Sequence, residues 1–207
     1  MKLYCATKNP GKLREFRAAA ARAGAETIVI EPIPGLEAIP APEETDESFE
    51  ANAIRKALYY GRFTPGLVFA EDSGLEVEAL GGEPGVRSAR YAGPSATDAD
   101  NNRLLLERLA GVEQRSAKFV SVIALVAGTE LLGTFRGEVE GWIAEQPRGS
   151  GGFGYDPLFY YPPLGRTFAE LTPEEKLAVS HRGRALEKLI RFLMDSRSSA
   201  RAGTGCS

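Results

Sequence analysis

One segment near the middle of this 207-residue chain, Phe119 to Val126, is apolar at almost every position. A strand with one face in solvent alternates apolar and polar residues, so a continuous apolar run predicts a strand buried on both faces. The segment Leu131 to Ile143, broken by Gly137, is expected to be its hairpin partner. Together the two segments predict a long central sheet whose faces are covered by helices.

The first half of the chain alternates short apolar segments with helical patterns. Strands are expected at Lys2 to Ala6, Thr27 to Ile30 and Leu67 to Ala70, and helices at Lys12 to Gly24, Phe49 to Tyr60, Thr97 to about Leu109 and Arg182 to about Met194. Alternation followed by a hairpin predicts an α/β fold with a mixed sheet. Residues 1–194 are expected to form one domain. Residues 195–207, rich in Ser, Arg and Gly, are expected to be disordered.

The bulk composition narrows the classes of partner. A net charge of -3 and a pI near 5.4 argue against a surface for nucleic acid, so any phosphate site must be local. Two cysteines, Cys5 and Cys206, cannot build a disulfide framework or a thiolate metal site. No apolar run approaches the ~18 residues of a membrane span. We expect a cytoplasmic protein that does not bind a membrane.

The segment Thr7 to Lys12 lies between the first strand and the first helix. Lys12 falls in the first helical turn, where the backbone N–H groups and the helix dipole already concentrate positive charge. A lysine there is unfavourable by up to ~1 kcal/mol, and a bound anion would remove the conflict. Asn9 can cap the helix, and Gly11 would let a ligand approach the backbone. The alternative is an ordinary junction with a solvated lysine.

A pair of carboxylates, Glu71 and Asp72, follows the third apolar segment. Carboxylate oxygens suit Mg²⁺, which usually also keeps water and substrate phosphate oxygens as ligands. The alternative is a turn, because Asp-Ser-Gly is favourable turn chemistry. Glu43 and Glu44, in a proline-rich acidic loop, could complete the metal shell, although alone they are typical of solvated surface charges.

The segment Gly149 to Gly154 formally matches the GxGxxG pattern of dinucleotide sites. That pattern must open a helix, whereas Tyr155-Asp156-Pro157 follows here. The segment is better interpreted as a loop that presents Phe153 and Tyr155 to a planar ligand. The alternative is a surface loop with buried aromatic residues.

Two helix starts follow near the end of the chain. Thr172, Pro173 and Glu175 form a capping box, with Lys176 next on that helix. Ser180 is expected to cap a second helix that begins with His181 and Arg182. Cationic side chains again stand at a positive helix end, as at Lys12. A lone histidine is more often structural, but a shared anionic ligand would account for both helix starts.

Five motifs follow one another between Met1 and about Leu193. They are Thr7 to Lys12, Ala70 to Leu75, Ser88 to Tyr91, Gly151 to Pro157 and Ser180 to Arg182. This set resembles the inosine triphosphate pyrophosphatase family, also called the XTP/dITP diphosphatases. The resemblance implies a two-lobed α/β fold with a long central mixed sheet, a cleft between the lobes and a homodimer. It also implies Mg²⁺-dependent hydrolysis of the purine nucleoside triphosphates ITP, dITP and XTP to the monophosphate and pyrophosphate.

The resemblance further implies roles for single residues. Asp72 would be the catalytic proton acceptor and a metal ligand, together with Glu43 or Glu44. The implied substrate-binding residues are Thr7, Lys8, Asn9, Pro10, Gly11, Lys12, Ser73, Phe153, Gly154, Tyr155, Asp156, Lys176, His181 and Arg182. Two departures stand out. Glu71 replaces a more usual aspartate, and Glu50 stands one residue away from the family's Glu-Asn-Ala position, which turns it by about 100° around the helix.

Two other functions compete with this interpretation. A Ser-Pro-Arg-Arg motif after the first strand is typical of related pyrophosphatases that act on pyrimidine triphosphates, and this chain lacks it. A non-catalytic nucleotide sensor would need the phosphate and base contacts but not Asp72. No residue can be assigned from the sequence to the rejection of GTP, which shares the O6 acceptor and N1 donor of the hypoxanthine base.

Overall fold

The computed structural model describes residues 1–23, 27–43 and 48–202. Its seven-stranded sheet has the order β2-β1-β3-β4-β5-β6-β7. The strands are β1 (Lys2–Cys5), β2 (Val29–Pro32), β3 (Leu67–Val77), β4 (Ser116–Ala127), β5 (Glu130–Ile143), β6 (Phe159–Tyr161) and β7 (Arg166–Thr167). The α-helices are α1 (Pro10–Arg22), α2 (Phe49–Gly61), α3 (Asp98–Arg108), α4 (Pro173–Val179) and α5 (His181–Ala202).

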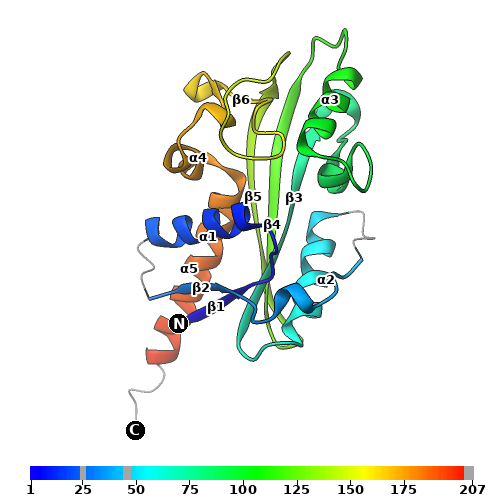
Figure 1. Cartoon of the computed structure of the whole chain (residues 1–207). Coiled ribbons are helices and arrows are strands. Elements are labelled where there is room, and N and C mark those ends of the chain that lie inside the picture. Colours follow the sequence, from blue (N-terminus) through cyan, green and yellow to red (C-terminus); the bar gives the residue numbers. More distant parts are fainter. Residues whose placement is uncertain (24–26, 44–47, 203–207) are drawn as a thin grey trace.

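The sheet is mixed, as the sequence predicts. β1 pairs in parallel with β2 and β3, and the pairs from β3 to β7 are antiparallel. Strand β4 lies in the middle, and its residues Phe119 to Val126 are buried, which confirms the central strand. Figure 1 shows β3, β4 and β5 running through the molecule, with β1, β2 and α2 near one end and α3 and β6 near the other.

Helices cover the two faces of the long strands with separate apolar clusters. α2 packs on the face that carries Val68, Ala70 and Val122. α1 and α5 pack on the opposite face, against Phe69 and Ile123. A third cluster fills the far end, around Leu75, Phe119, Phe159 and Phe168. None of the described helices is long and apolar enough to cross a membrane.

Strand β3 has an edge that is only partly covered. β1 pairs with Leu67, Val68 and Phe69 alone, and the N–H of Ala6 donates to the carbonyl of Phe69 at 2.9 Å. Further along this edge, the 3₁₀ helix η3 (Gly85–Arg90) contacts β3, because Ser88 Oγ accepts from the N–H of Leu75 at 2.9 Å. Between these contacts, no described strand pairs with this edge at residues 70–73.

Three expectations about element boundaries are wrong. β3 does not end at Ala70, because antiparallel pairing with β4 continues from Leu67 to Val77 and places Glu71 and Asp72 inside the strand. Gly137 does not break β5: it pairs with Ser121, and a Cβ at this position would collide with the backbone of α5. The last helix does not end near Met194.

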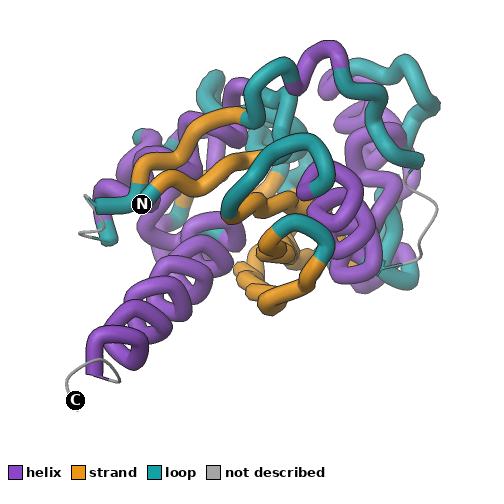
Figure 2. Tube along the Cα trace, turned by 90° about the horizontal axis from the view of Figure 1, so that it is seen from below, coloured by secondary structure: helices purple, strands orange, loops and turns teal. Residues whose placement is uncertain are grey.

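Helix α5 instead continues through residue 202, so residues 195–202 are helical and not a disordered tail. Figure 2 shows this helix extending away from the rest of the molecule. The remaining predicted tail, residues 203–207, lies outside the described residues.

Candidate active site

The start of α1 is built as its sequence predicts. Asn9 Oδ1 accepts from the N–H groups of Gly11 at 2.8 Å and Lys12 at 3.1 Å, which confirms the cap. Gly11 lies close to Phe153, because two atoms of that ring would lie 3.3 Å from an added Cβ, so a larger residue here would press on the ring. Lys8 Nζ donates to two carbonyls of the loop after β2, so this side chain holds that loop.

Lys12 and Arg182 meet at a buried carboxylate on β3. Lys12 Nζ lies 2.7 Å from Glu71 Oε2, and Arg182 Nε lies 3.1 Å from Glu71 Oε1. The hydroxyl of Ser121, on β4, donates to the same Oε1 at 2.9 Å. Burial alone would raise the pKa of Glu71, but the charges of Arg182 and Lys12 outweigh it and hold the pKa well below its usual range.

A second group of charges adjoins the first. Arg182 also donates to Glu15, on α1, and to Ser73 Oγ at 2.9 Å. Lys176 Nζ lies 2.8 Å from Glu15 Oε1 and 2.6 Å from Asp156 Oδ2. Burial raises the pKa of Asp156, although Lys176 acts in the opposite direction.

The two groups together form one cluster of three carboxylates and three cations, which balance. Their members are Glu15, Glu71, Asp156, Lys12, Lys176 and Arg182. Because buried charges are stable only when paired, this cluster ties the starts of α1 and α5 to β3.

The glycine-rich segment is a loop held against this cluster, and no helix begins there. Asp156 Oδ2 accepts from the N–H of Phe153 at 2.8 Å. Glycine is favoured at residue 152 because its φ is +71° and because an added Cβ would collide with the side chain of Asp156. Lys176 Nζ lies 4.8 Å from the centroid of the Phe153 ring, and Arg182 Cζ lies 5.4 Å from it. The backbone of Gly154 is also fixed, because its N–H donates to Asp98 at 2.6 Å.

Tyr155 is held inside the protein, and its contact with a ligand stays a prediction. It is buried, and its hydroxyl donates to the carbonyl of Ser88 at 2.8 Å. Ser88 belongs to the Ser88-to-Tyr91 motif and also donates its own hydroxyl to the carbonyl of Gly85 at 2.6 Å. This motif therefore braces both the open edge of β3 and the loop that carries Phe153.

His181 is the first residue of α5 and lies in the interior. Its ring stacks on Phe119 with centroids 4.7 Å apart and planes inclined by 13°. Its Nδ1 is buried and has no hydrogen-bond partner. Burial and the charge of Arg182 hold the pKa of His181 well below its usual range, so the imidazole is neutral at pH 7. His181 lines a cavity of about 140 Å³ together with Lys12, Ser73 and Phe153.

This burial predicts a pH dependence of stability. In the unfolded chain His181 binds a proton below about pH 6.5, whereas the folded protein resists protonation. The free energy of unfolding should therefore fall as the pH decreases from about 6.5 to about 5, by up to ~1.4 kcal/mol per pH unit. Denaturant unfolding across this window, for the wild type and His181→Ala, measures the effect. If the free energy of unfolding depends on pH equally in the two proteins, the prediction is wrong.

Asp72 lies on the opposite face of β3 from Glu71, because neighbouring side chains alternate along a strand. Lys56 Nζ lies 2.7 Å from Asp72 Oδ1, and Asn52 Nδ2 donates to Oδ2 at 3.2 Å. Both partners come from α2, four residues apart and therefore on one helical face. Glu50 points elsewhere and accepts from Thr134 Oγ1 at 2.6 Å.

The open edge of β3 explains how the two faces can serve one ligand. A molecule that lies across residues 70–73 can contact Ser73 and the charge cluster on one face and Asp72 on the other. The start of α1 lies at one end of this edge and Ser88 at the other. One extended ligand could thus meet cations, a carboxylate and an aromatic pocket in turn.

The sequence-predicted residues are not all brought together. Lys12, Asn9, Ser73, Lys176 and the residues 153–156 and 181–182 line the cavity. Thr7, Lys8 and Pro10 line an adjoining hollow beside the loop after β2. Glu43 is exposed in its loop, and Glu44 lies outside the described residues. No described group of three or more His, Cys, Asp or Glu side chains could by itself hold a metal ion.

Residues of the site that were missed in the sequence include Glu15, Asn52, Lys56 and Ser121. Asn52 and Lys56 carry a local signal, their four-residue spacing on a predicted helix, and Ser121 is the one polar residue in the apolar run from Phe119 to Val126. Glu15 acts on residues far away in the sequence, and nothing near it in the chain distinguishes it.

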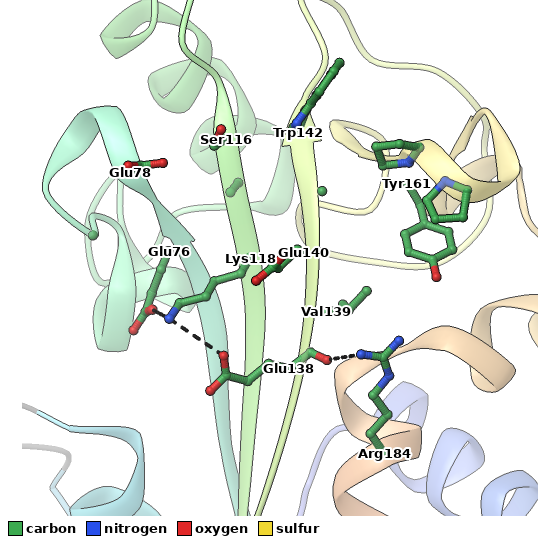
Figure 3. Close-up of a pocket in the computed structure, with 15 residues that line it drawn as sticks. Glu76, Glu78, Ser116, Lys118, Glu138, Val139, Glu140, Trp142, Tyr161 and Arg184 are labelled. Carbon is green, nitrogen blue, oxygen red and sulfur yellow. Dashed lines mark hydrogen bonds and ion pairs between the residues drawn. The ribbon is translucent and has the colours of Figure 1, made fainter.

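A larger cavity, of about 920 Å³, lies on an open part of the sheet (Figure 3). Lys118 Nζ there lies 3.1 Å from Glu76 Oε2 and 3.7 Å from Glu138 Oε2, and Trp142 lines the same cavity further along β5. None of the residues of the predicted site lines it. Size alone therefore does not mark the site, whereas the paired buried charges do.

Cations at two helix starts, an aromatic pocket and a carboxylate at an open strand edge together suit a nucleotide. Comparison with known proteins gives the family. The profile of the Ham1 family matches residues 3–192. A dITP/XTP pyrophosphatase from Acidobacterium capsulatum is 49% identical over 197 residues, covering 91% of this chain and 96% of that protein. The chain belongs to the Ham1 family.

Solved structures agree with this assignment. A HAM1 protein from Coxiella burnetii superposes with a TM-score of 0.84 at 42% identity, covering 94% of this chain and 99% of that one. The Ham1 protein of Staphylococcus aureus gives a TM-score of 0.83 at 39% identity, covering 95% of this chain and 100% of that one. The expected mixed α/β fold is therefore confirmed.

Proposed function

We propose that this chain hydrolyses ITP, dITP and XTP to the nucleoside monophosphate and pyrophosphate, and so removes deaminated purines from the nucleotide pool. The observation that carries the proposal is the arrangement around the open edge of β3. Lys12, Phe153 and His181 line one cavity together with Ser73, and Asp72 is the neighbour of Ser73 on β3, which supports a site for one extended ligand. The name of the Acidobacterium relative supports the same reaction.

The two ends of the substrate meet different chemistry. Lys12 would hold the triphosphate, because a helix start is a favourable place for an anion and Lys12 adds its own charge there. Phe153 would stack on the planar base, and the neutral His181 would donate one N–H to the oxygen at C6. The unpartnered Nδ1 of His181 shows that this ring keeps an unused hydrogen-bonding group inside the protein.

Asp72 would perform the proton transfer. Lys56 and Asn52 fix its carboxylate, so that it can accept a proton from the water that attacks the α-phosphorus. Lys12 would stabilise charge on the departing pyrophosphate. No covalent intermediate is required, because water is the nucleophile and pyrophosphate leaves directly.

We also propose Mg²⁺ dependence. The residues present fit the ion, since Mg²⁺ commonly binds through one or two carboxylates with substrate phosphates and water. Asp72 would supply a carboxylate, with Glu43 or Glu44 as the second. When bound, Mg²⁺ would neutralise charge on the triphosphate.

Pyrophosphate release from ITP, with Mg²⁺ and with EDTA, tests this function. The expected result is rapid release with Mg²⁺ and little with EDTA. CTP and UTP serve as comparison substrates, because faster turnover of these would favour the pyrimidine alternative. Tight ITP binding without turnover would favour the nucleotide sensor.

Lys12→Ala is expected to lower kcat as well as kcat/KM for ITP. The reason is that a cation matched to charge on the departing pyrophosphate contributes more in the transition state than in the substrate complex. Steady-state kinetics in low salt measures this. Arg14→Ala is the matched control, because Arg14 is an exposed cation on the same helix. Equal kinetics for the two variants would show that Lys12 takes no part in catalysis.

The assembly and location are proposed on the family resemblance. We propose a homodimer in the cytoplasm. Light scattering after size-exclusion chromatography should give twice the chain mass of 22.3 kDa, and a single-chain mass would contradict the dimer.

A further inference from the structure

Glu71 contacts cations from both ends of the proposed site. Lys12, at the start of α1, belongs to the triphosphate end. Arg182, at the start of α5, adjoins His181 and the Phe153 ring at the base end. We infer that Glu71 is a positioning residue that fixes these two cations relative to each other and so couples base recognition to triphosphate placement. The inference rests on the proposed function and deepens it.

The carboxylate itself is held inside the protein, more deeply than Lys12. Its side chain is 2% exposed, against 22% for Lys12. It stands inside β3, which is paired with β4 along Leu67 to Val77, and Ser121 of β4 donates to its Oε1. Glu71 is therefore a rigid reference point on the central sheet, to which two separate helix starts are attached.

Each oxygen of Glu71 serves a different cation. Oε2 accepts from Lys12 at 2.7 Å, and Oε1 accepts from Arg182 at 3.1 Å. The amide of glutamine has the same shape, but only its carbonyl oxygen accepts a hydrogen bond. Its NH₂ group would face the second cation, donor against donor. Glu71→Gln should thus disturb both ends of the site, although neither cation is changed.

Glu15 offers a matched comparison. It contacts Arg182 and Lys176 and has no contact with Lys12 among those that the structure describes. Glu15→Gln should therefore affect the base end alone. The two variants make the same chemical change in the same charge cluster and differ in whether Lys12 is touched.

Two inhibitors separate the ends. Inorganic tripolyphosphate probes the triphosphate end without a base, and inosine probes the base end without phosphate. We expect Glu71→Gln to weaken inhibition by both, and to lower kcat/KM for ITP by about 10- to 100-fold, the range for hydrogen bonds to charged groups. Glu15→Gln should weaken inhibition by inosine and leave inhibition by tripolyphosphate unchanged. Glu71→Asp, which keeps the charge, should recover part of the loss.

Several outcomes would overturn the inference. If Glu71 merely weakens the charge of Lys12, Glu71→Gln will bind tripolyphosphate more tightly than the wild type. If its role is only structural, the melting temperature will fall while both inhibition constants stay unchanged. Should Glu71→Gln not fold, Ser121→Ala removes one bond to Oε1 without a change of charge, and unchanged inhibition by both probes would refute the coupling. A wild type inactive on ITP would instead refute the proposed function.

Discussion

Asp72→Asn is expected to lower kcat for ITP by about 10²- to 10⁴-fold, the usual contribution of a positioned acid–base group. An amide keeps the shape of the carboxylate and its bond to Asn52, but it cannot accept a proton from the attacking water. It also loses the charge that Lys56 pairs with at 2.7 Å. Single-turnover measurement at saturating Mg²⁺ isolates the chemical step from binding.

Glu76→Gln is the matched control for this prediction. Glu76 lies four residues along β3 and on the same face, but it pairs with Lys118 away from the open edge. The same change from acid to amide should there leave kcat unaltered. Near-normal turnover of Asp72→Asn, with a normal melting curve, would remove Asp72 from the mechanism.

Local signals in the sequence were sufficient for much of the fold. The apolar run from Phe119 to Val126 identifies the central strand because burial on both faces demands it. The caps at Asn9 and Thr172 are correct, since a side chain that bonds an N–H two or three residues later needs only its own segment. These features depend on residues that are close together in the sequence.

Strand β3 shows where local signals fail. Asp72-Ser73-Gly74 is favourable turn chemistry, yet pairing with β4 keeps it extended. That pairing is a contact between residues about fifty positions apart, which no local pattern reports. Its consequence is chemical, because a strand places Glu71 and Asp72 on opposite faces and a turn would not. Glu71 therefore pairs with Lys12 and Arg182, whereas Asp72 pairs with Lys56 of α2.

The site itself could be predicted only in part. Cations at the starts of α1 and α5 are locally unfavourable, and from this conflict the sequence analysis predicted a shared anionic ligand, which stays a prediction. In the structure, protein carboxylates already meet much of the requirement, since Glu71 and Glu15 pair with Lys12 and Arg182. Identifying those carboxylates requires the tertiary fold.

His181→Ala is expected to lower kcat/KM for ITP by about 10- to 150-fold and to change the value for ATP much less. The base of ITP has an acceptor oxygen at C6, whereas adenine has an amino donor there. A neutral imidazole that donates to this position favours the oxygen and opposes the amino group. Loss of one hydrogen bond involving a buried group costs roughly 1.5–3 kcal/mol, which corresponds to this range.

The ITP/ATP ratio separates this role from a structural one. His181 stacks on Phe119, so its loss will also lower the melting temperature. Ile190→Ala, a buried change further along α5, provides the control: it should lower stability and leave the ratio as in the wild type. If His181→Ala behaves like Ile190→Ala, His181 only braces the start of α5. If the ITP/ATP ratio of kcat/KM narrows in His181→Ala and not in Ile190→Ala, the imidazole of His181 recognises the base.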